Sequence, residues 1–223
     1  MVIPALHEAR QLPEAIRSAR APGVEIIVVD GGSGDATRES ASAAGARVVA
    51  SAAGRARQLQ TGVDATDAET VLFLHADTIL PIGWADAVRG VLSDPAVAGG
   101  AFAFRFSARD RAQAGFGLRL VEWGARVRSH RFGLPYGDQA LFVRRSVLAE
   151  LGGVPQVAIM EDLDLVQAIR RAGRLALLPE EVSTSARRHL DGGVLRTALG
   201  HVLALLAFGL GVDRARVARW MRR

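Results

Sequence analysis

Cysteine, lysine and asparagine are all absent from the 223 residues of this chain. Without cysteine the chain has no disulfides, no thiolate metal sites and no cysteine nucleophile. Without lysine it has no Walker-type phosphate loop, and all 28 basic residues are arginines. A hydrophobic content of 49% with 23% charged residues excludes global disorder. The length is enough for one large domain with a buried core.

Long hydrophobic runs and targeting signals are also missing. The longest uncharged stretch near the C-terminus, 197–212, has 16 residues, fewer than the roughly 20 that a membrane-spanning helix needs. Its apolar positions run nearly all the way round a helix, which favours a buried or interfacial helix. Residues 1–4 lack the charged and apolar regions of a signal peptide. We therefore expect a cytoplasmic protein, with peripheral contact at the inner face of the membrane as a further expectation.

The positive charge is concentrated at the C-terminal end. From residue 187 onward, eight arginines stand against two aspartates, a net of +6, whereas residues 1–186 sum to −1. Such a segment predicts either an anionic contact surface or a solvated basic tail. The apolar stretch 194–210 before the last arginines fits a helix on an anionic membrane, near lipid-linked or amphiphilic acceptors. The alternative, a helix that closes the core or forms a homodimer, is slightly favoured.

Short apolar runs alternate with helical patterns in the first half of the chain. Strands are predicted at 2–5, 25–30, 47–50 and 70–75, with helices at 13–19, 35–45 and 54–63 between them. This order is typical of a doubly wound parallel sheet, whose ligands bind beyond the carboxyl ends of the strands. The second half predicts strands at 97–106 and 139–143, and helices at 111–129, from 146 and at 160–172. No linker interrupts the chain, so we expect one domain over 1–190 with a helical segment at 191–223.

Two segments at predicted strand ends carry acidic residues. Asp30 precedes small residues and a helix start, which suits the base or ribose of a nucleotide but also describes an ordinary turn. His75 and Asp77 would point to the same side of an extended backbone and could share one cation. A carboxylate with an imidazole suits Mn²⁺ better than Mg²⁺.

Two predicted helix starts carry charged residues. Glu161 and Asp162 gain stabilisation there from the helix dipole, and either this capping or a general base is consistent with the sequence. Arg55 and Arg57, in the segment Gly-Arg-Ala-Arg-Gln, would meet a diphosphate or form an ordinary surface pair.

The order of these segments resembles a known family. Ile3-Pro4 with Glu8, then 29–35, 54–58, 74–77, 135–139 and Glu161-Asp162 resemble the inverting family 2 glycosyltransferases of the GT-A fold. The Gly-Arg-x-x-Gln and Gly-Asp-Gln elements are similar to those of a small bacterial, single-domain subgroup. The resemblance runs from residue 2 to about 190. It implies a Rossmann-like, doubly wound mixed sheet with C-terminal helices.

The resemblance also implies roles for the matching residues. Contacts to the nucleotide sugar fall on Pro4, Glu8, Asp30, Gly31, Arg55, Arg57, His75 and Asp77. A divalent metal, Mn²⁺ or Mg²⁺, would sit on the diphosphate at Asp77 and His75. Asp162 would be the general base, assisted by Glu161, and Asp138 and Gln139 would contact donor or acceptor. The implied reaction moves one sugar from a nucleotide-diphosphate sugar, expected to be a UDP-sugar, to an acceptor hydroxyl with inversion, and nucleic acid is not an expected partner.

The sequence departs from the family pattern at three places. His7 replaces the usual Asn, and His75 replaces the first acid of the Asp-x-Asp motif. The Gln-x-x-Arg-Trp motif of polymer synthases is missing, because Arg219-Trp220 lies too near the end of the chain, and this predicts transfer of a single sugar. Two alternatives stay open: a sugar-phosphate nucleotidyltransferase, which would need a glycine-rich loop at 4–8, and a non-catalytic nucleotide-binding module, against which Asp162 argues.

Overall fold

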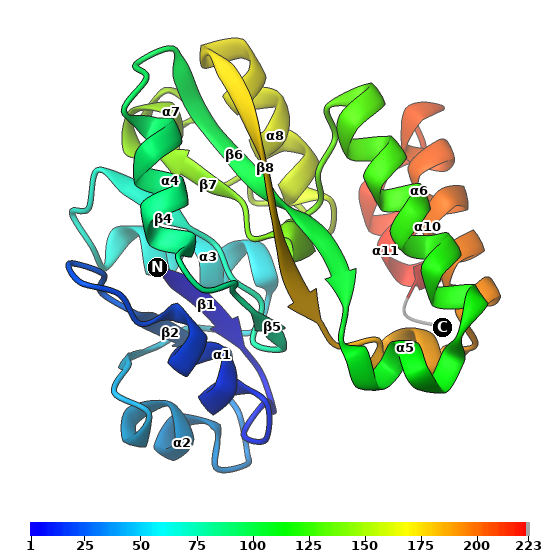
Figure 1. Ribbon diagram of the computed structural model, residues 1–223, viewed down its shortest axis with the longest axis horizontal. Coiled ribbons are helices and arrows are strands. Elements are labelled where there is room, and N and C mark those ends of the chain that lie inside the picture. The colour runs from blue at the N-terminus through cyan, green and yellow to red at the C-terminus, as the bar shows by residue number, and fades with distance from the viewer. Residues whose placement is uncertain (222–223) are drawn as a thin grey trace.

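The computed structural model describes residues 1–221 as two sheets with helices on both sides (Figure 1). The first sheet is parallel and consists of β1 (Val2–Ala5), β2 (Ile27–Asp30) and β3 (Arg47–Ala50), in that order. The second is mixed, with the order β4 (Thr70–Leu72), β7 (Phe142–Arg144), β6 (Val97–Phe106), β8 (Arg174–Thr184) and β5 (Thr78–Ile79). A bridge between Val2 and Phe73 joins the two sheets. The predicted mixed α/β class is therefore confirmed.

Two apolar layers cover opposite faces of these sheets. One contains Ile3 and Val28 with the apolar sides of α1 (Leu12–Ala19), α2 (Thr37–Ala43) and α4 (Trp84–Leu92). The other contains Val2 and Val29 with those of α3 (Arg55–Asp64), α7 (Arg145–Leu151) and α8 (Glu161–Ala172). Neighbouring strand residues enter different layers because side chains alternate along a strand. Helices on both faces make the sheet doubly wound, as predicted.

Five further helices lie beside the sheet. They are α5 (Ala108–Ala114), α6 (Phe116–Phe132), α9 (Arg187–Gly192), α10 (Val194–Gly209) and α11 (Arg214–Met221). A small apolar cluster around Phe104, Phe106 and Leu118 connects α5, α6, α9 and the start of α10 to the ends of β6 and β8. Arg214 of α11 forms a bidentate ion pair with Asp164 of α8, with N–O distances of 2.5 and 2.8 Å. Among residues 1–221, no helix is both long and apolar enough to cross a bilayer.

Several predicted boundaries are wrong for local reasons. The helix predicted at 111–129 is two helices, α5 and α6, separated at Gly115, whose φ is +53°. The strand predicted at 70–75 ends at Leu72. The strand predicted at 139–143 begins only at Phe142, because residues 137–139 form a 3₁₀ turn.

The long strand β8 was not predicted at all. Its sequence contains alanine, Pro179 and two glutamates, which are poor strand formers. The pairing of β6 with β8 shifts between Phe102/Ala103 and Leu178/Glu181, so Pro179 and Glu180 occupy an irregularity in the ladder. Proline is tolerated in a sheet at such a position. Pairing with the buried strand β6 therefore overrides the weak local preference.

Candidate active site

Backbone strain marks one region of the molecule. Three non-glycine residues in the described chain have left-handed φ values: His7 (57°), Ala140 (49°) and Met160 (65°). They directly adjoin Glu8, Gln139 and Glu161, which the sequence places in the site. Such conformations cost on the order of 1–3 kcal/mol each and cluster at functional sites. Backbone conformation is therefore an observation independent of the motifs, and it indicates the same region of the molecule.

Pro4 lies at the point where β1 and the segment that follows β4 diverge. The carbonyls of Met1 and Ala5 accept hydrogen bonds from the β2 side, whereas the Val2 carbonyl accepts one from Leu74 at 3.0 Å. The even positions of β1 therefore face the segment after β4, which turns away beyond Leu74. A proline has no N–H to leave unpaired there. The gap at this strand end is the usual ligand position in an open α/β sheet.

Asp30 is fully buried at the end of β2, and residues of the following turn and helix donate hydrogen bonds to its carboxylate. It accepts hydrogen bonds from the Gly32 and Ser33 amides at 3.2 Å and from Arg38 Nε at 2.6 Å. Burial raises its pKa, but the bonds from Ser33 and Arg38 outweigh this and hold the pKa below its usual value. Asp30 is therefore a stable carboxylate, and its Oδ2 is already paired with Arg38.

Gln58 joins the two strand ends below this turn. Its Nε2 donates to the carbonyls of Ala5 and Val29, both at 2.9 Å, and its side chain is 4% exposed. A Cβ at Gly31 would lie 3.0 Å from the same amide, so only glycine fits closely there. The Gln of the Gly-Arg-x-x-Gln element thus fixes the floor of the site. Arg57 of the same element is exposed to solvent.

Glu8 and Asp77 form an acidic pair facing two arginines of α9. Glu8 Oε1 accepts a hydrogen bond from Arg187 Nη2 at 2.8 Å. Burial raises the pKa of Asp77 and the charge of Glu8 raises it further, while Arg188 and Arg187 act in the opposite direction. The sequence did not identify these two arginines as site residues. The concentration of positive charge that begins at Arg187 was the one available signal.

The expectation of an extended backbone at 75–77 is wrong. Thr78 N donates to the His75 carbonyl at 3.1 Å, so the segment is a turn. Burial, and then the charges of Arg55 and Arg188, lower the pKa of His75 well below its ordinary value. The imidazole is therefore neutral, which is the form that binds metals.

The donor atoms present here fit a divalent metal. Glu8 Oε2, His75 Nε2 and Asp138 Oδ1 are buried and have no hydrogen-bond partner among the described residues. Together with the Asp77 carboxylate these are oxygen and nitrogen ligands of the kind that Mn²⁺ accepts. Within residues 1–221, no three acidic or histidine side chains form a ready-made cage. Phosphate oxygens and water would have to complete the coordination, as is usual for Mg²⁺ sites.

Asp162 and Glu161 begin α8 directly opposite the 137–139 turn. Asp162 Oδ2 accepts a hydrogen bond from Gly137 N at 2.8 Å. Glu161 is 5% exposed and pairs with Arg55 Nε at 2.8 Å. A Cβ at Gly137 would overlap the Arg55 guanidinium and lie 3.3 Å from Asp162 Oδ2. Arg55 is thus wedged between the turn and α8, and glycine at 137 makes room for it.

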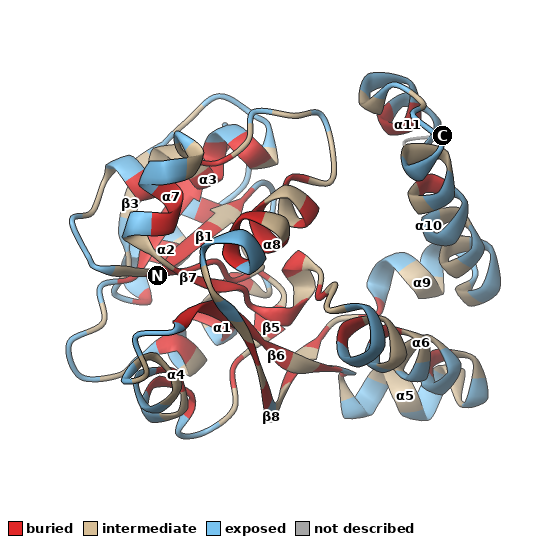
Figure 2. Ribbon diagram, turned by 90° about the horizontal axis from the view of Figure 1, so that it is seen from above, coloured by how far each residue is buried: buried red, intermediate tan, exposed pale blue. Residues whose placement is uncertain are grey.

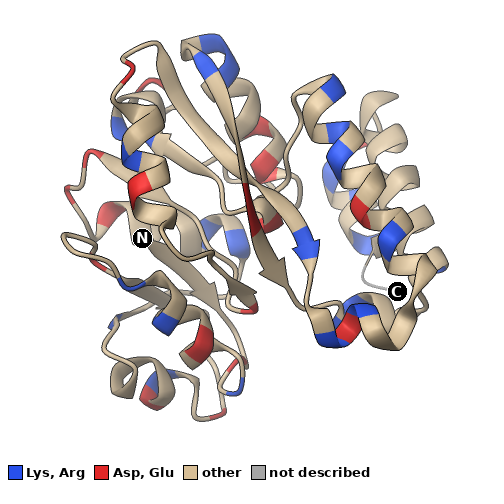
Figure 3. Cartoon of the chain, viewed as in Figure 1, with Lys and Arg blue, Asp and Glu red and all other residues tan. Residues whose placement is uncertain are grey.

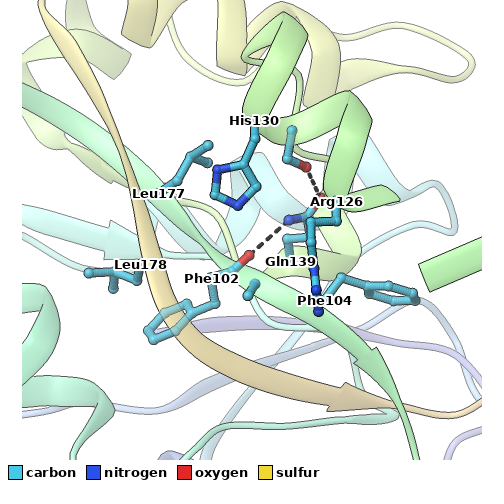
Figure 4. A pocket seen from close by; sticks show the side chains of 9 residues that line it. Phe102, Phe104, Arg126, His130, Gln139, Leu177 and Leu178 are labelled. Atoms are coloured by element: carbon cyan, nitrogen blue, oxygen red, sulfur yellow. Dashed lines mark hydrogen bonds between the residues drawn. The ribbon is translucent and has the colours of Figure 1, made fainter. Parts of the chain in front are cut away.

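Gln139 is buried and bonded internally. Its Oε1 accepts from Ser129 Oγ at 2.8 Å and from Arg128 and Tyr136 N at 3.2 Å, and its Nε2 donates to the Phe102 carbonyl at 2.8 Å. The adjacent cavity in Figure 4, of about 10 Å³, has room for one water at most. The geometry therefore favours a positioning role for Gln139 over the predicted contact with donor or acceptor.

Asp138 stands at the centre of these groups. Burial raises its pKa to about 6, opposed by Arg128 and reinforced by Asp162, with smaller effects from Arg55 and Asp77. Charged residues of α3, α8 and the turn after β4 therefore all influence the pKa of Asp138. Segments that are far apart in the sequence converge on a single acidic centre lined by arginines.

The raised pKa of Asp138 predicts a pH dependence of stability. Between the unfolded value of 3.8 and the folded value of about 6, the folded protein retains a proton that the unfolded chain releases. Stability attributable to this group therefore falls as the pH rises from about 4 to about 6. Asp138→Asn should be more stable than the wild type at pH 7.5, and the difference should close toward pH 4. Thermal unfolding across this range, with the exposed-site variant Asp86→Asn as control, tests this; a difference independent of pH would contradict it.

Comparisons with known proteins agree with the fold and the motifs. The model of the family described as glycosyl transferase family 2 matches residues 1–152, and the chain belongs to this family. It is a glycosyltransferase, which removes the nucleotidyltransferase and the non-catalytic module as alternatives. The match ends before Glu161 and Asp162, so the roles of these two residues depend on the geometry.

Solved structures of glucosyl-3-phosphoglycerate synthase from Mycobacterium tuberculosis are similar in fold. The complex with Mn²⁺ and UDP-glucose is 24% identical over 95% of this chain and 78% of that chain, with a TM-score of 0.64. The complex with Mn²⁺, UDP and glucosyl-3-phosphoglycerate is 21% identical over 91% and 77%, and that with Mg²⁺ and UDP gives the same values; both have a TM-score of 0.62. The predicted GT-A fold is thereby confirmed. No curated protein matches the chain.

Proposed function

We propose that this glycosyltransferase moves one sugar from a UDP-sugar to an acceptor hydroxyl with inversion at the anomeric carbon. The observation that carries the proposal is the meeting of Asp162, Arg55, Asp138 and Asp77 at the carboxyl end of the sheet. A carboxylate suited to take a proton lies there beside groups suited to a diphosphate. Family membership supplies the reaction class, and the similar synthase binds UDP and UDP-glucose.

The donor side is formed by the ends of β1 and β2 with α9. Pro4, Glu8, Asp30 and Gly31 line the nucleotide position, and Arg187 and Arg188 offset the charge of the diphosphate. Asp77, with His75, would hold a divalent ion, which neutralises charge developing on the leaving diphosphate. The similar synthase was crystallised with Mn²⁺ or Mg²⁺.

Asp162 is the general base in this proposal. It removes the proton of the acceptor hydroxyl, whose oxygen then forms a bond to the anomeric carbon on the face opposite UDP. The bond from that carbon to the diphosphate oxygen breaks, and UDP leaves with the electron pair. A single displacement of this kind inverts the centre. The Gly137 N–H holds the carboxylate, and the Arg55–Glu161 ion pair fixes the first turn of α8.

Thermal unfolding with UDP, GDP, TDP or CMP, each with and without Mn²⁺, tests the donor assignment. A ligand at 100 times its dissociation constant stabilises by about 2.7 kcal/mol, which for a chain of this size is a rise of roughly 5–10 °C. We expect UDP to give the largest rise, and Mn²⁺ to increase it. A larger rise with another nucleotide would change the donor class, and no rise with any of them would contradict the proposed site.

A further inference from the structure

One side of α10 is apolar and uncovered. Along this helix and at its C-terminal cap, the exposed large apolar side chains are Leu195, Leu199, Val202, Leu203, Leu206 and Leu210. At 100° per residue they fall within one arc of the helix, opposite the buried Ala204. Figure 2 shows α9 and α10 mostly exposed at the edge of the molecule, whereas the sheet and its covering helices are buried. An uncovered stripe of this length marks an interaction surface.

The neighbouring helix α6 adds aromatic residues of the same kind. Phe116, Leu120 and Trp123 are 80%, 44% and 63% exposed and occupy one face at i, i+4 and i+7. The beginnings of α6 and α10 touch, because a Cβ at Gly117 would lie 3.3 Å from Val194. We call these three residues and the six of α10 the outer face.

The two helices of the outer face and the adjoining α11 carry exposed arginines without acidic partners among residues 1–221. Arg119 of α6, Arg196 of α10, and Arg216 and Arg219 of α11 are exposed, and none makes an ion pair within residues 1–221. Figure 3 shows several basic residues, in blue, along the ribbon of α6. The combination of Trp, Phe and Leu with flanking arginine is typical of helices that lie in a membrane interface.

An exposed apolar face could bind either a second copy of the chain or a lipid surface, and the charge around it distinguishes the two. Residues 108–132 and 187–221, which contain these helices, hold twelve arginines and four acidic residues, a net of +8. Residues 1–107 and 133–186 have a net of −5. A second copy bound through the same face would bring two positive surfaces together. An anionic lipid surface instead attracts basic residues beside the apolar side chains.

We propose that the outer face docks on an anionic phospholipid surface, with α10 lying in the plane of the interface. Its 16 residues extend about 24 Å along the surface. The same α6 reaches the active site at its other end, where Arg128 lies over the Tyr136 ring at 3.2 Å from the ring centroid. Docking therefore holds α6 at the lipid surface and, resting on the proposed function, favours an acceptor that this surface presents.

Vesicle co-sedimentation tests the docking without donor or acceptor, so its outcome is independent of the proposed reaction. The wild-type chain should sediment with vesicles of phosphatidylcholine and phosphatidylglycerol at low salt. It should sediment much less with phosphatidylcholine alone or at high salt, because ions screen the attraction. The double variant Leu199→Asp/Leu206→Asp should bind at least about tenfold more weakly. Arg119→Gln/Arg196→Gln should weaken binding to the anionic vesicles only.

Ile82→Asp is the matched control, because Ile82 is fully exposed but lies between β5 and α4, away from the outer face. It should sediment like the wild type. Each variant should retain the wild-type unfolding temperature and its rise with UDP and Mn²⁺, which separates lost docking from a lost site. No sedimentation of the wild type at low salt, or sedimentation unchanged in both double variants, would overturn the proposal. A wild-type dimer that Leu199→Asp/Leu206→Asp separates, with no vesicle binding, would assign the face to a second copy.

Discussion

Asp162→Asn should lower turnover at least about a hundredfold and leave the affinity for UDP nearly unchanged, since general base catalysis contributes about 10²–10⁴-fold. The amide has nearly the shape of the carboxylate, and its oxygen still accepts the hydrogen bond from Gly137 N. It cannot take a proton from the acceptor. The loss should therefore appear in turnover, measured as UDP release in the presence of an acceptor, and not in the UDP-dependent rise in unfolding temperature.

Asp164→Asn, two residues further along α8, provides the matched control. Asp164 lies on the same helix but pairs with Arg214 of α11 instead of facing Gly137. The variant loses part of that ion pair, so it should unfold at a lower temperature and keep most of its turnover. An Asp162→Asn variant with near wild-type turnover would refute the assignment of the base. Equal losses of turnover in both variants would instead attribute the effect to disturbance of α8.

Asp77→Asn should have opposite effects on the free and the liganded protein. In the free protein, burial and Glu8 both disfavour the ionised carboxyl, as its raised pKa shows. Replacing it with a neutral amide should leave the unfolding temperature unchanged or raise it. With UDP and Mn²⁺ the variant should lose the metal-dependent part of the stabilisation. Turnover should fall at least about a hundredfold, since a metal supplies several kcal/mol of charge stabilisation in such a step.

The comparison needs unfolding curves with UDP alone and with UDP and Mn²⁺. Asp86→Asn, whose side chain is 87% exposed, is the control and should behave like the wild type in both. Retention of the full Mn²⁺ effect in Asp77→Asn would exclude Asp77 as a metal ligand. His75→Gln in the same series reports on the second proposed ligand, because loss of the Mn²⁺ effect is expected only if the ring nitrogen binds the ion.

The first half of the fold could be predicted because its elements have clear local signals. The apolar runs at 2–5 and 47–50 and the helix pattern at 13–19 correspond to β1, β3 and α1 within one residue. The acidic residues expected near strand ends do lie there, with Asp30 at the end of β2 and Asp77 after β4. The strand β8 could not be predicted, since its stability comes from pairing along β6 and not from its own residues.

The sequence indicated which residues gather in the candidate site, but not which of them form hydrogen bonds and ion pairs with one another. Arg55 was expected near a diphosphate, yet it pairs with Glu161, more than 100 residues away in the sequence. Gln139 was expected to contact ligand, yet four internal bonds hold it in the core. Polar side chains take whichever partner folding brings near, because an unpaired buried polar group is costly. A single sequence contains no local signal for that choice.

Local patterns in the sequence were enough to establish the doubly wound core, the edge of the sheet at which the motifs meet, and the absence of any thiol or lysine chemistry. Periodicity and residue type suffice for these, because they depend on local backbone preference and on which functional groups exist at all. Three features are visible only in the folded chain. Arg187 donates a hydrogen bond to Glu8, 179 residues away, and Arg55 forms an ion pair with Glu161 at the start of α8. One apolar side of α10 is left uncovered. These features arise from packing between distant segments, which no window along the chain contains.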